Sequence, residues 1–198
     1  MRLAVAIPMK PLHLAKARLR PGLDDAARQR LAAAMLTHVL ETVAASTAEI
    51  CGVVSADPDV LALAAEHGCE AITEPEPGGY NAAASRASIW AQRHDCDALL
   101  ILPADLPLLT PEDIHNLTRL ADARPQVVVI APDAREEGTN ALLLRPPDII
   151  PPSFGLNSFH RHQQLVRTMG VDLIVHRSLT IAQDIDWIED LQLFSGRK

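Results

Sequence analysis

An aspartate directly after an apolar run is the residue of this sequence best suited to chemistry. Asp105 stands in the turn Pro103–Pro107, which follows the wholly apolar stretch Ala98–Leu102. Ligands of open α/β sheets bind beyond the carboxyl ends of such strands, and a hard cation such as Mg²⁺ prefers oxygen ligands there. The position therefore favours a metal-binding carboxylate. A turn aspartate that caps nearby backbone amides is the competing interpretation.

A second acidic pair lies near the end of the chain. Asp184 and Asp186 follow Ser178–Ala182, which we predict to be a strand. Side chains at positions i and i+2 of an extended chain share one face, so both carboxylates could reach one metal ion. Asp186 could equally cap the predicted helix that contains Ile188 and Leu191.

A cationic loop follows the first predicted strand, Leu3–Pro8. It contains Lys10, Lys16, Arg18 and Arg20, and thus two of the three lysines of the chain. Cations just beyond a parallel strand could neutralise a triphosphate and stabilise the charge that builds on a leaving pyrophosphate. An ordinary solvated basic loop is the alternative. The sequence has neither a P-loop string nor a Gly-x-Gly-x-x-Gly string, so those phosphate-binding motifs do not account for the loop.

Two small polar segments, Gly138–Leu142 and Phe154–Phe159, lie between these regions. Turn amides, hydroxyls and a helix amino terminus suit an anionic ligand, although an ordinary turn and an ordinary helix cap would look the same. His160 and His162 are two positions apart on the predicted helix and do not face each other. We predict surface histidines there and no metal pair.

The elements that must position these residues alternate between strand and helix. The predicted strands are Leu3–Pro8, Ile50–Ser55, Glu70–Thr73, Ala98–Leu102, Val127–Ile130, Asn140–Leu144, Val171–Val175 and Ser178–Ala182. Helices are predicted around Leu31–Val43, at Asp57–Glu66 and Ala82–Arg93, after the Thr110–Pro111 cap, and from Asn157 or Ser158. This order predicts an α/β fold with a mainly parallel, mixed sheet and helices on both faces. Residues 1–198 are expected to form a single domain.

Composition narrows the function further. A net charge of -7 and a pI near 5.6 argue against nucleic acid as a partner. No apolar run approaches the roughly 20 residues of a membrane span, and no signal peptide is evident, so we expect no membrane partner and a cytoplasmic protein. Cys51, Cys69 and Cys96 are widely spaced beside predicted strands; we predict buried thiols, with zinc or disulfide roles as alternatives.

Six short motifs occur in a specific order along essentially the whole chain. They are Pro8-x-Lys10-x-Leu12-x-x-Ala15-Lys16-x-Arg18-Leu19, Asn81-Ala82-Ala83, Pro103-Ala104-Asp105-Leu106-Pro107, Gly138-Thr139-Asn140-Ala141-Leu142, Phe154-Gly155-x-x-Ser158-Phe159 and Asp184-Ile185-Asp186. In this order they resemble the 2-phospho-L-lactate guanylyltransferase family of deazaflavin coenzyme biosynthesis. The first-loop and Asp-Leu-Pro features would also fit molybdenum-cofactor and sugar-phosphate nucleotidyltransferases.

The resemblance implies a GT-A-like, Rossmann-related nucleotidyltransferase fold. Its members join GTP to 2-phospholactate, phosphoenolpyruvate or 3-phosphoglycerate and release pyrophosphate. A non-catalytic nucleotide-binding protein of the same fold is the alternative of a different class. Homodimerisation stays open.

The resemblance also implies roles for individual residues. Asp105, Asp184 and Asp186 would bind Mg²⁺; Thr139, Gly155 and Ser158 would surround the acid; Lys10, Lys16 and Arg18 would face phosphates; Asn81 would line the nucleotide pocket; and Asp105, Lys10 and Lys16 would be catalytic. The sequence departs from the family pattern at Glu137, Leu156-Asn157 and Trp187-Ile188. The first two departures flank the implied acid site, so they bear on the choice of acid.

Overall fold

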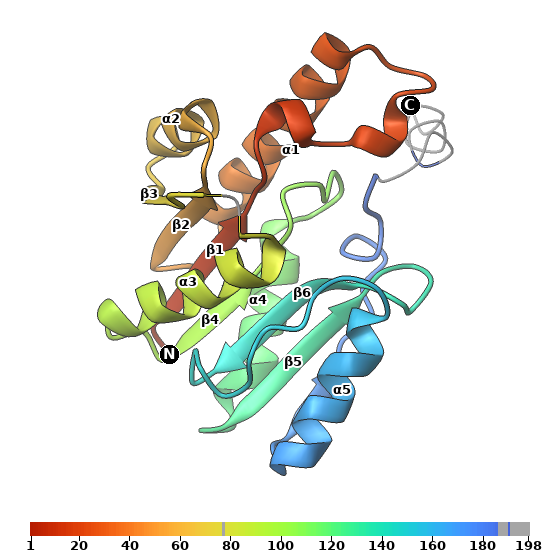
Figure 1. The fold of residues 1–198 in the computed structure, drawn as a ribbon. Coiled ribbons are helices and arrows are strands. Elements are labelled where there is room, and N and C mark those ends of the chain that lie inside the picture. Colours follow the sequence, from red (N-terminus) through yellow and green to blue (C-terminus); the bar gives the residue numbers. More distant parts are fainter. Residues whose placement is uncertain (77, 186–189, 191–198) are drawn as a thin grey trace.

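A mixed β-sheet forms the centre of the computed structural model, which describes residues 1–76, 78–185 and 190 (Figure 1). Across the sheet the strands of these residues follow the order β3-β2-β1-β4-β6-β5-β7. Their bounds are β1 Leu3–Pro8, β2 Ile50–Ser55, β3 Glu70–Thr73, β4 Ala98–Ile101, β5 Val127–Pro132, β6 Thr139–Arg145 and β7 Leu173–Val175. Within the described chain only β6 runs against the others. The predicted mainly parallel, mixed sheet is confirmed.

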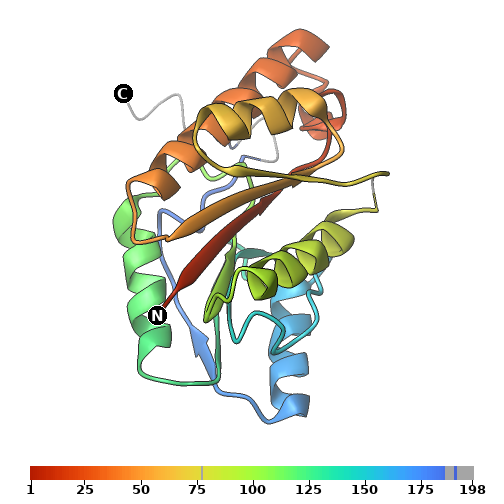
Figure 2. The same cartoon turned by 90° about the vertical axis from the view of Figure 1, so that its left-hand side faces the viewer.

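Helices cover both faces of this sheet, as predicted (Figure 2). The helices are α1 Asp25–Ala44, α2 Pro58–Glu66, α3 Tyr80–Arg93, α4 Pro111–Asp122 and α5 Ser158–Met169. Apolar residues of α1, α2 and α4 form one core with one face of the sheet, and those of α3 and α5 form a second core with the other face. Strands β1, β4 and β5 are buried along their whole length. This explains their continuous apolar sequences, because strands covered on both faces have no solvent-facing side.

Helix starts read from the sequence are also confirmed. The Asp57 carboxylate accepts a hydrogen bond from the Asp59 amide at 3.0 Å ahead of α2. Thr110 and Asp113 form a reciprocal capping box at the start of α4, with Pro111 as the first helical residue. None of the helices in the described residues has the length and apolar character needed to cross a bilayer.

Ser178–Ala182 is not a strand, and that prediction is wrong. The segment folds into a turn in which the Ala182 amide donates to the Ser178 carbonyl at 3.0 Å. The Ser178 and Thr180 hydroxyls both donate to Asp113 of α4 at 2.7 Å. Hydroxyl side chains that bond locally compete with strand pairing, and here they also find a buried acceptor on a distant helix.

Cys51 and Cys69 are paired as a disulfide, so the prediction of separate thiols is wrong for these two residues. The parallel register of β2 and β3 places Gly52 opposite Glu70 and brings the preceding cysteines to a Cα–Cα distance of 4.7 Å. This distance suits a disulfide. Cys96 is a buried free thiol, as predicted.

Candidate active site

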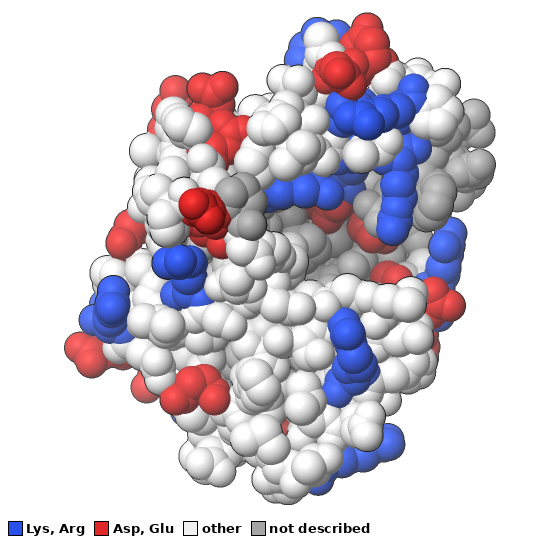
Figure 3. Space-filling model, viewed as in Figure 1, with Lys and Arg blue, Asp and Glu red and all other residues white. Residues whose placement is uncertain are grey.

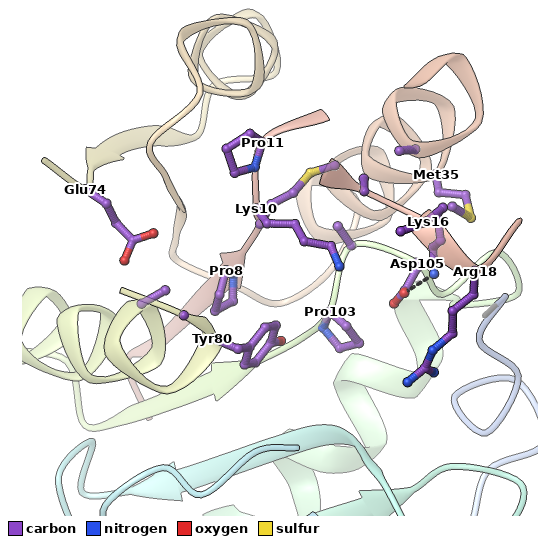
Figure 4. A pocket seen from close by; sticks show the side chains of 17 residues that line it. Pro8, Lys10, Pro11, Lys16, Arg18, Met35, Glu74, Tyr80, Pro103 and Asp105 are labelled. Carbon is purple, nitrogen blue, oxygen red and sulfur yellow. Dashed lines mark hydrogen bonds and ion pairs between the residues drawn. The ribbon is translucent and has the colours of Figure 1, made fainter. Parts of the chain in front are cut away.

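A cavity of about 510 Å³ opens at the carboxyl ends of β1, β3 and β4. It is the hollow in Figure 3, where cationic side chains stand on the rim. Figure 4 shows it from close by. Its lining comes from the loop after β1, from α1, from the start of α3 and from the turns after β3 and β4: Pro8, Met9, Lys10, Pro11, Ala15, Lys16, Ala17, Arg18, Ala32, Met35, Glu74, Gly79, Tyr80, Ala83, Pro103, Ala104 and Asp105.

The cationic loop forms one wall of this cavity and is hydrogen-bonded to α1. Buried Arg28 of α1 donates from Nη1 to the Ala15 carbonyl, which fixes the backbone beside Lys16. Lys16 has left-handed backbone angles (φ 52°, ψ 37°) that are uncommon for residues other than glycine. Its side chain is 7% exposed, and its ammonium forms an ion pair with the Asp105 carboxylate. Lys16 is thus a buried cation aimed at the cavity.

Lys10 and Arg18 extend the positive charge across the same cavity. Figure 4 shows the Lys10 side chain between the walls and the Arg18 guanidinium near Asp105. Three cations on one concave surface, in a protein with a net charge of -7, give this cavity a locally positive lining. Lys10, Lys16 and Arg18 thus line one cavity, and their role in facing phosphates stays a prediction.

Asp105 lies on the cavity wall immediately beyond β4. Its side chain is 24% exposed, and the Lys16 ammonium already lies against it. The position of Asp105 therefore suits a cation. Among residues 1–76, 78–185 and 190 no three Asp, Glu, His or Cys side chains gather as metal ligands. Asp186 of the predicted ligand set lies outside the described residues.

Packing of Ile185 brings the segment of Asp184 against the cationic loop. Ile185 is 2% exposed and forms a small core with Leu19 of the cationic loop and Met35 of α1. The turn before it is anchored by buried Asn140, which donates to the Ile181 carbonyl at 2.9 Å. The structure therefore brings the segment of Asp184 against the loop that carries Lys16 and Arg18, although more than 160 residues of sequence separate them.

Asp113 of α4 also anchors the turn Ser178–Ala182, by accepting hydrogen bonds from the Ser178 and Thr180 hydroxyls. Burial alone would raise the pKa of this carboxyl, but hydrogen bonds from Thr180, Thr110 and Ser178 outweigh burial and hold the pKa below its ordinary value. The ionised Asp113 serves both the cap of α4 and the turn ahead of Asp184. Its role is to position this segment.

Two polar residues of the cavity wall, Glu74 and Tyr80, were not among the predicted site residues. The Tyr80 hydroxyl is buried and has no hydrogen-bond partner within the described residues. Burial and the negative charge of Asp105 raise the pKa of Tyr80, so the hydroxyl keeps its proton and remains a donor. Both residues flank a Pro- and Gly-rich connection whose composition indicates a loop and nothing more.

The predicted acid-binding hydroxyls form a buried network. Ser158 donates to Thr139 Oγ1 at 3.2 Å, and Thr139 Oγ1 lies 3.1 Å from His162 Nδ1. The Ser153 amide donates to His162 Nε2 at 2.9 Å. A backbone amide can only donate, so Nε2 accepts and the ring proton sits on Nδ1, facing Thr139. His162 is fully buried, which corrects the prediction of a surface histidine; His160 is exposed, as predicted.

Asn81, at the start of α3, holds the segment Phe154–Phe159, which is predicted to bind the acid substrate. It does not line the cavity; its side chain accepts from the Phe154 amide at 2.6 Å and donates to the Phe154 carbonyl at 3.1 Å. The neighbouring Tyr80 ring meets the Phe154 ring edge to face at 4.7 Å. Gly155 follows with φ 110°, a conformation that favours glycine. The start of α3 therefore fixes the loop that carries Gly155 and Ser158.

Two of the departures from the family pattern, Glu137 and Leu156-Asn157, lie in or next to the segments that carry Thr139, Gly155 and Ser158. Glu137 is exposed, and its carbonyl accepts from the Phe159 amide at 3.0 Å, which ties the turn before Thr139 to the start of α5. Leu156 is 83% exposed, and Asn157 adopts left-handed angles without capping α5 through its side chain. Trp187 and Ile188 lie outside the described residues.

Protonation of His162 is expected to destabilise the protein in mildly acidic solution. Burial, with a smaller contribution from the Arg161 charge, lowers the pKa of His162 to about 4 from 6.5. Between these values the unfolded chain binds more protons than the folded chain, so the free energy of unfolding falls as pH falls. The full loss is up to about 3 kcal/mol. Urea unfolding at pH 7, 6, 5 and 4.5 measures this change.

The matched variants are His162→Gln and, on the exposed face of the same helix, His160→Gln. The stability gap between wild type and His162→Gln should narrow as pH falls, while the gap to His160→Gln should stay constant. A gap to His162→Gln that is independent of pH would contradict the buried neutral imidazole.

Solved structures identify the class of the fold. A nucleotidyl transferase from Methanothermobacter superposes with a TM-score of 0.73 at 14% identity, with 98% of this chain and 95% of that chain covered. The fold is that of the GT-A-like nucleotidyltransferases.

The sequence comparisons identify the family within that class. Residues 3–195 match the family model described as "Guanylyl transferase CofC like". A phosphoenolpyruvate guanylyltransferase of Sphaerobacter thermophilus is 39% identical over 191 residues, which are 96% of this chain and 91% of the relative. A 2-phospho-L-lactate guanylyltransferase of Methanothermobacter thermautotrophicus is 35% identical over 191 residues, 96% of this chain and 83% of the relative. The chain belongs to the CofC-like guanylyl transferase family.

Proposed function

We propose that this protein transfers GMP from GTP to a phosphorylated three-carbon acid, with release of pyrophosphate, in the biosynthesis of a deazaflavin coenzyme. The observation that carries the proposal is that Lys10, Lys16, Arg18 and Asp105 line one cavity, where Lys16 and Asp105 form an ion pair. The names of the relatives support guanylyl transfer and an acid of the phosphoenolpyruvate or 2-phospholactate type. We place the reaction in the cytoplasm, within one domain that acts alone or as a homodimer.

The reaction requires no covalent enzyme intermediate. An oxygen of the acid's phosphate attacks the α-phosphorus of GTP; a new P–O bond forms, and the bond between the α-phosphorus and the bridging oxygen breaks with its electrons leaving on pyrophosphate. A phosphate monoester is largely ionised near neutral pH, so no general base is needed. Lys10, Lys16 and Arg18 bind the phosphates and stabilise the charge that develops on the leaving group.

Asp105 offers an oxygen ligand for Mg²⁺ in this cavity. Asp105, together with Asp184 and Asp186, would hold the ion, and the Lys16 ammonium on Asp105 marks a position that accepts positive charge. Bound there, Mg²⁺ would neutralise phosphate charge and orient the two reactants. Thr139, Gly155 and Ser158 would bind the acid, with His162 directing its Nδ1 proton to Thr139 and so leaving the Thr139 hydroxyl proton for another acceptor.

A pyrophosphate-release assay tests the proposal. GTP and CTP are each incubated with phosphoenolpyruvate, 2-phospholactate, 3-phosphoglycerate and glucose 1-phosphate, with Mg²⁺ or with excess EDTA. We expect release with GTP and at least one of the three acids, and its loss in EDTA. Preferred turnover of CTP with the sugar phosphate would indicate a different nucleotidyltransferase. Tight GTP binding without turnover of any acceptor would indicate a non-catalytic nucleotide-binding protein.

A further inference from the structure

The Glu74 side chain is a buried carboxylate on the cavity wall without a hydrogen bond to one of its oxygens. The residue is 6% exposed, and its Oε1 atom has no partner within the described residues. Among the residues that the structure describes, none forms a salt bridge with Glu74. A buried acceptor without a partner costs free energy unless a ligand supplies the donor.

The backbone fixes where this carboxylate stands. Glu74 directly follows β3, and its amide donates to the Ser55 carbonyl at 2.9 Å, which continues the pairing of β3 with β2. Gly78 lies against the side chain: a Cβ added there would stand 4.0 Å from Glu74 Oε1 and 2.8 Å from the Ala82 Cβ. A side chain at position 78 would therefore clash with Ala82 of α3, on the chain segment that lies beside Glu74.

Glu74 and the phosphate-binding cations occupy different ends of the cavity. Figure 4 shows Glu74 well apart from Lys16, Arg18 and Asp105, with Lys10 and Tyr80 between them. A nucleoside triphosphate is also different at its two ends, because it carries its base at one end and its phosphates at the other. If the triphosphate lies on the cationic loop and the base enters the rest of the same cavity, the base reaches the end where Glu74 stands.

We infer that Glu74 is the residue that selects guanine, by accepting hydrogen bonds from the N1–H and the N2 amino group of the base. This inference rests on the proposed function, since it takes the cavity as the GTP site. An ionised carboxylate only accepts hydrogen bonds, and it has two oxygens side by side. Guanine presents two adjacent donors on its Watson–Crick edge, whereas adenine and cytosine each place a ring-nitrogen acceptor beside their amino group. Glu74 would therefore repel those two bases.

The electrostatics of the site agree with this assignment. Burial raises the pKa of Glu74, and the charge of Arg86 offsets the rise only in part. The free protein thus holds a carboxylate in a place that disfavours its charge. A charged group that lowers the stability of the free protein and lies in a cavity is commonly retained because it binds a ligand.

The test measures nucleotide binding by calorimetry with Mg²⁺ and no acid substrate. The wild-type chain should bind GTP about tenfold to a hundredfold more tightly than ITP, which lacks the 2-amino group. The Glu74→Gln variant should weaken GTP binding by about the same factor and bind GTP and ITP with similar affinity. Its unfolding temperature should equal or exceed that of wild type, because a buried charge has been removed. Glu76→Gln, an exposed neighbour outside the cavity lining, should change nothing.

Three results would overturn the inference. Equal affinity of the wild-type chain for GTP and ITP would show that the amino group is not read, whatever the variant does. Equal weakening of GTP and ITP in Glu74→Gln would assign the residue to another part of the ligand. If the wild-type chain bound 2′-deoxy-GTP as weakly as Glu74→Gln binds GTP, and the variant bound the two nucleotides equally, Glu74 would be assigned to the ribose hydroxyls. Because no turnover is measured, a protein that reads guanine but transfers GMP to no acid would contradict the proposed function alone.

Discussion

Replacing Asp105 with Asn is expected to lower the rate constant for pyrophosphate release by about a thousandfold or more. The substitution keeps the shape of the side chain and an oxygen that can still accept from Lys16, but it removes the negative charge that would hold Mg²⁺ beyond β4. The charge of a metal ligand is needed most in the transition state, where phosphate charge is redistributed. The rate at saturating GTP and acid is the measurement.

The fold should survive this change, since the Asp105 side chain is 24% exposed and lies outside both sheet cores. Cooperative thermal unfolding of Asp105→Asn would establish that the loss is chemical. Asp59→Asn, on the exposed first turn of α2, is the matched control and should retain wild-type turnover. Near wild-type pyrophosphate release by Asp105→Asn would refute the assignment of this residue as a metal ligand.

Replacing Lys16 with Met is expected to lower kcat/KM for GTP by about a hundredfold to a thousandfold. Methionine matches much of the length of the lysine stem, so the packing is kept while the ammonium is lost. Lys16 is 7% exposed and points into the cavity from a backbone held by Arg28. A buried, pre-positioned cation stabilises developing phosphate charge more strongly than a solvated one.

The cationic loop offers its own control for Lys16→Met. Arg20 is 62% exposed, pairs with Asp25 and does not line the cavity, so Arg20→Met should leave kcat/KM unchanged. If both variants lost activity alike, the loop would act through its general positive charge. If Lys16→Met kept kcat/KM within about threefold of wild type, Lys16 would have no direct role in phosphate binding.

The local signals of the sequence were sufficient for most of the elements. The apolar run before Asp105, the cap at Asp57 and the Thr110–Pro111 helix start each depend on residues that are close in sequence. Such features report local backbone preferences and burial on both faces, which a single chain segment encodes. The position of Asp105 in the turn beyond the carboxyl end of β4 followed from them.

Predictions that depended on distant partners were wrong or incomplete. The Ser178–Ala182 segment has an apolar residue at every second position, like a strand, but its hydroxyls bond to Asp113 of α4. His162 is polar, yet Thr139, Ser153 and Phe154 enclose it, and it becomes a buried neutral base. No local pattern distinguishes these environments from a strand or from a solvent-exposed helix face.

By itself, the sequence determined the α/β order, the cationic loop, the carboxylate beyond β4 and the resemblance to its family. Only the tertiary structure decided that Cys51 meets Cys69, that Ile185 packs on Leu19 beside the cavity, and that Glu74 stands across that cavity from Lys16. The physical reason is that neighbouring parallel strands must be joined by long crossover connections, so residues at the same edge of the sheet are far apart in sequence. The register and packing of those crossovers place residues together that no spacing along the chain relates.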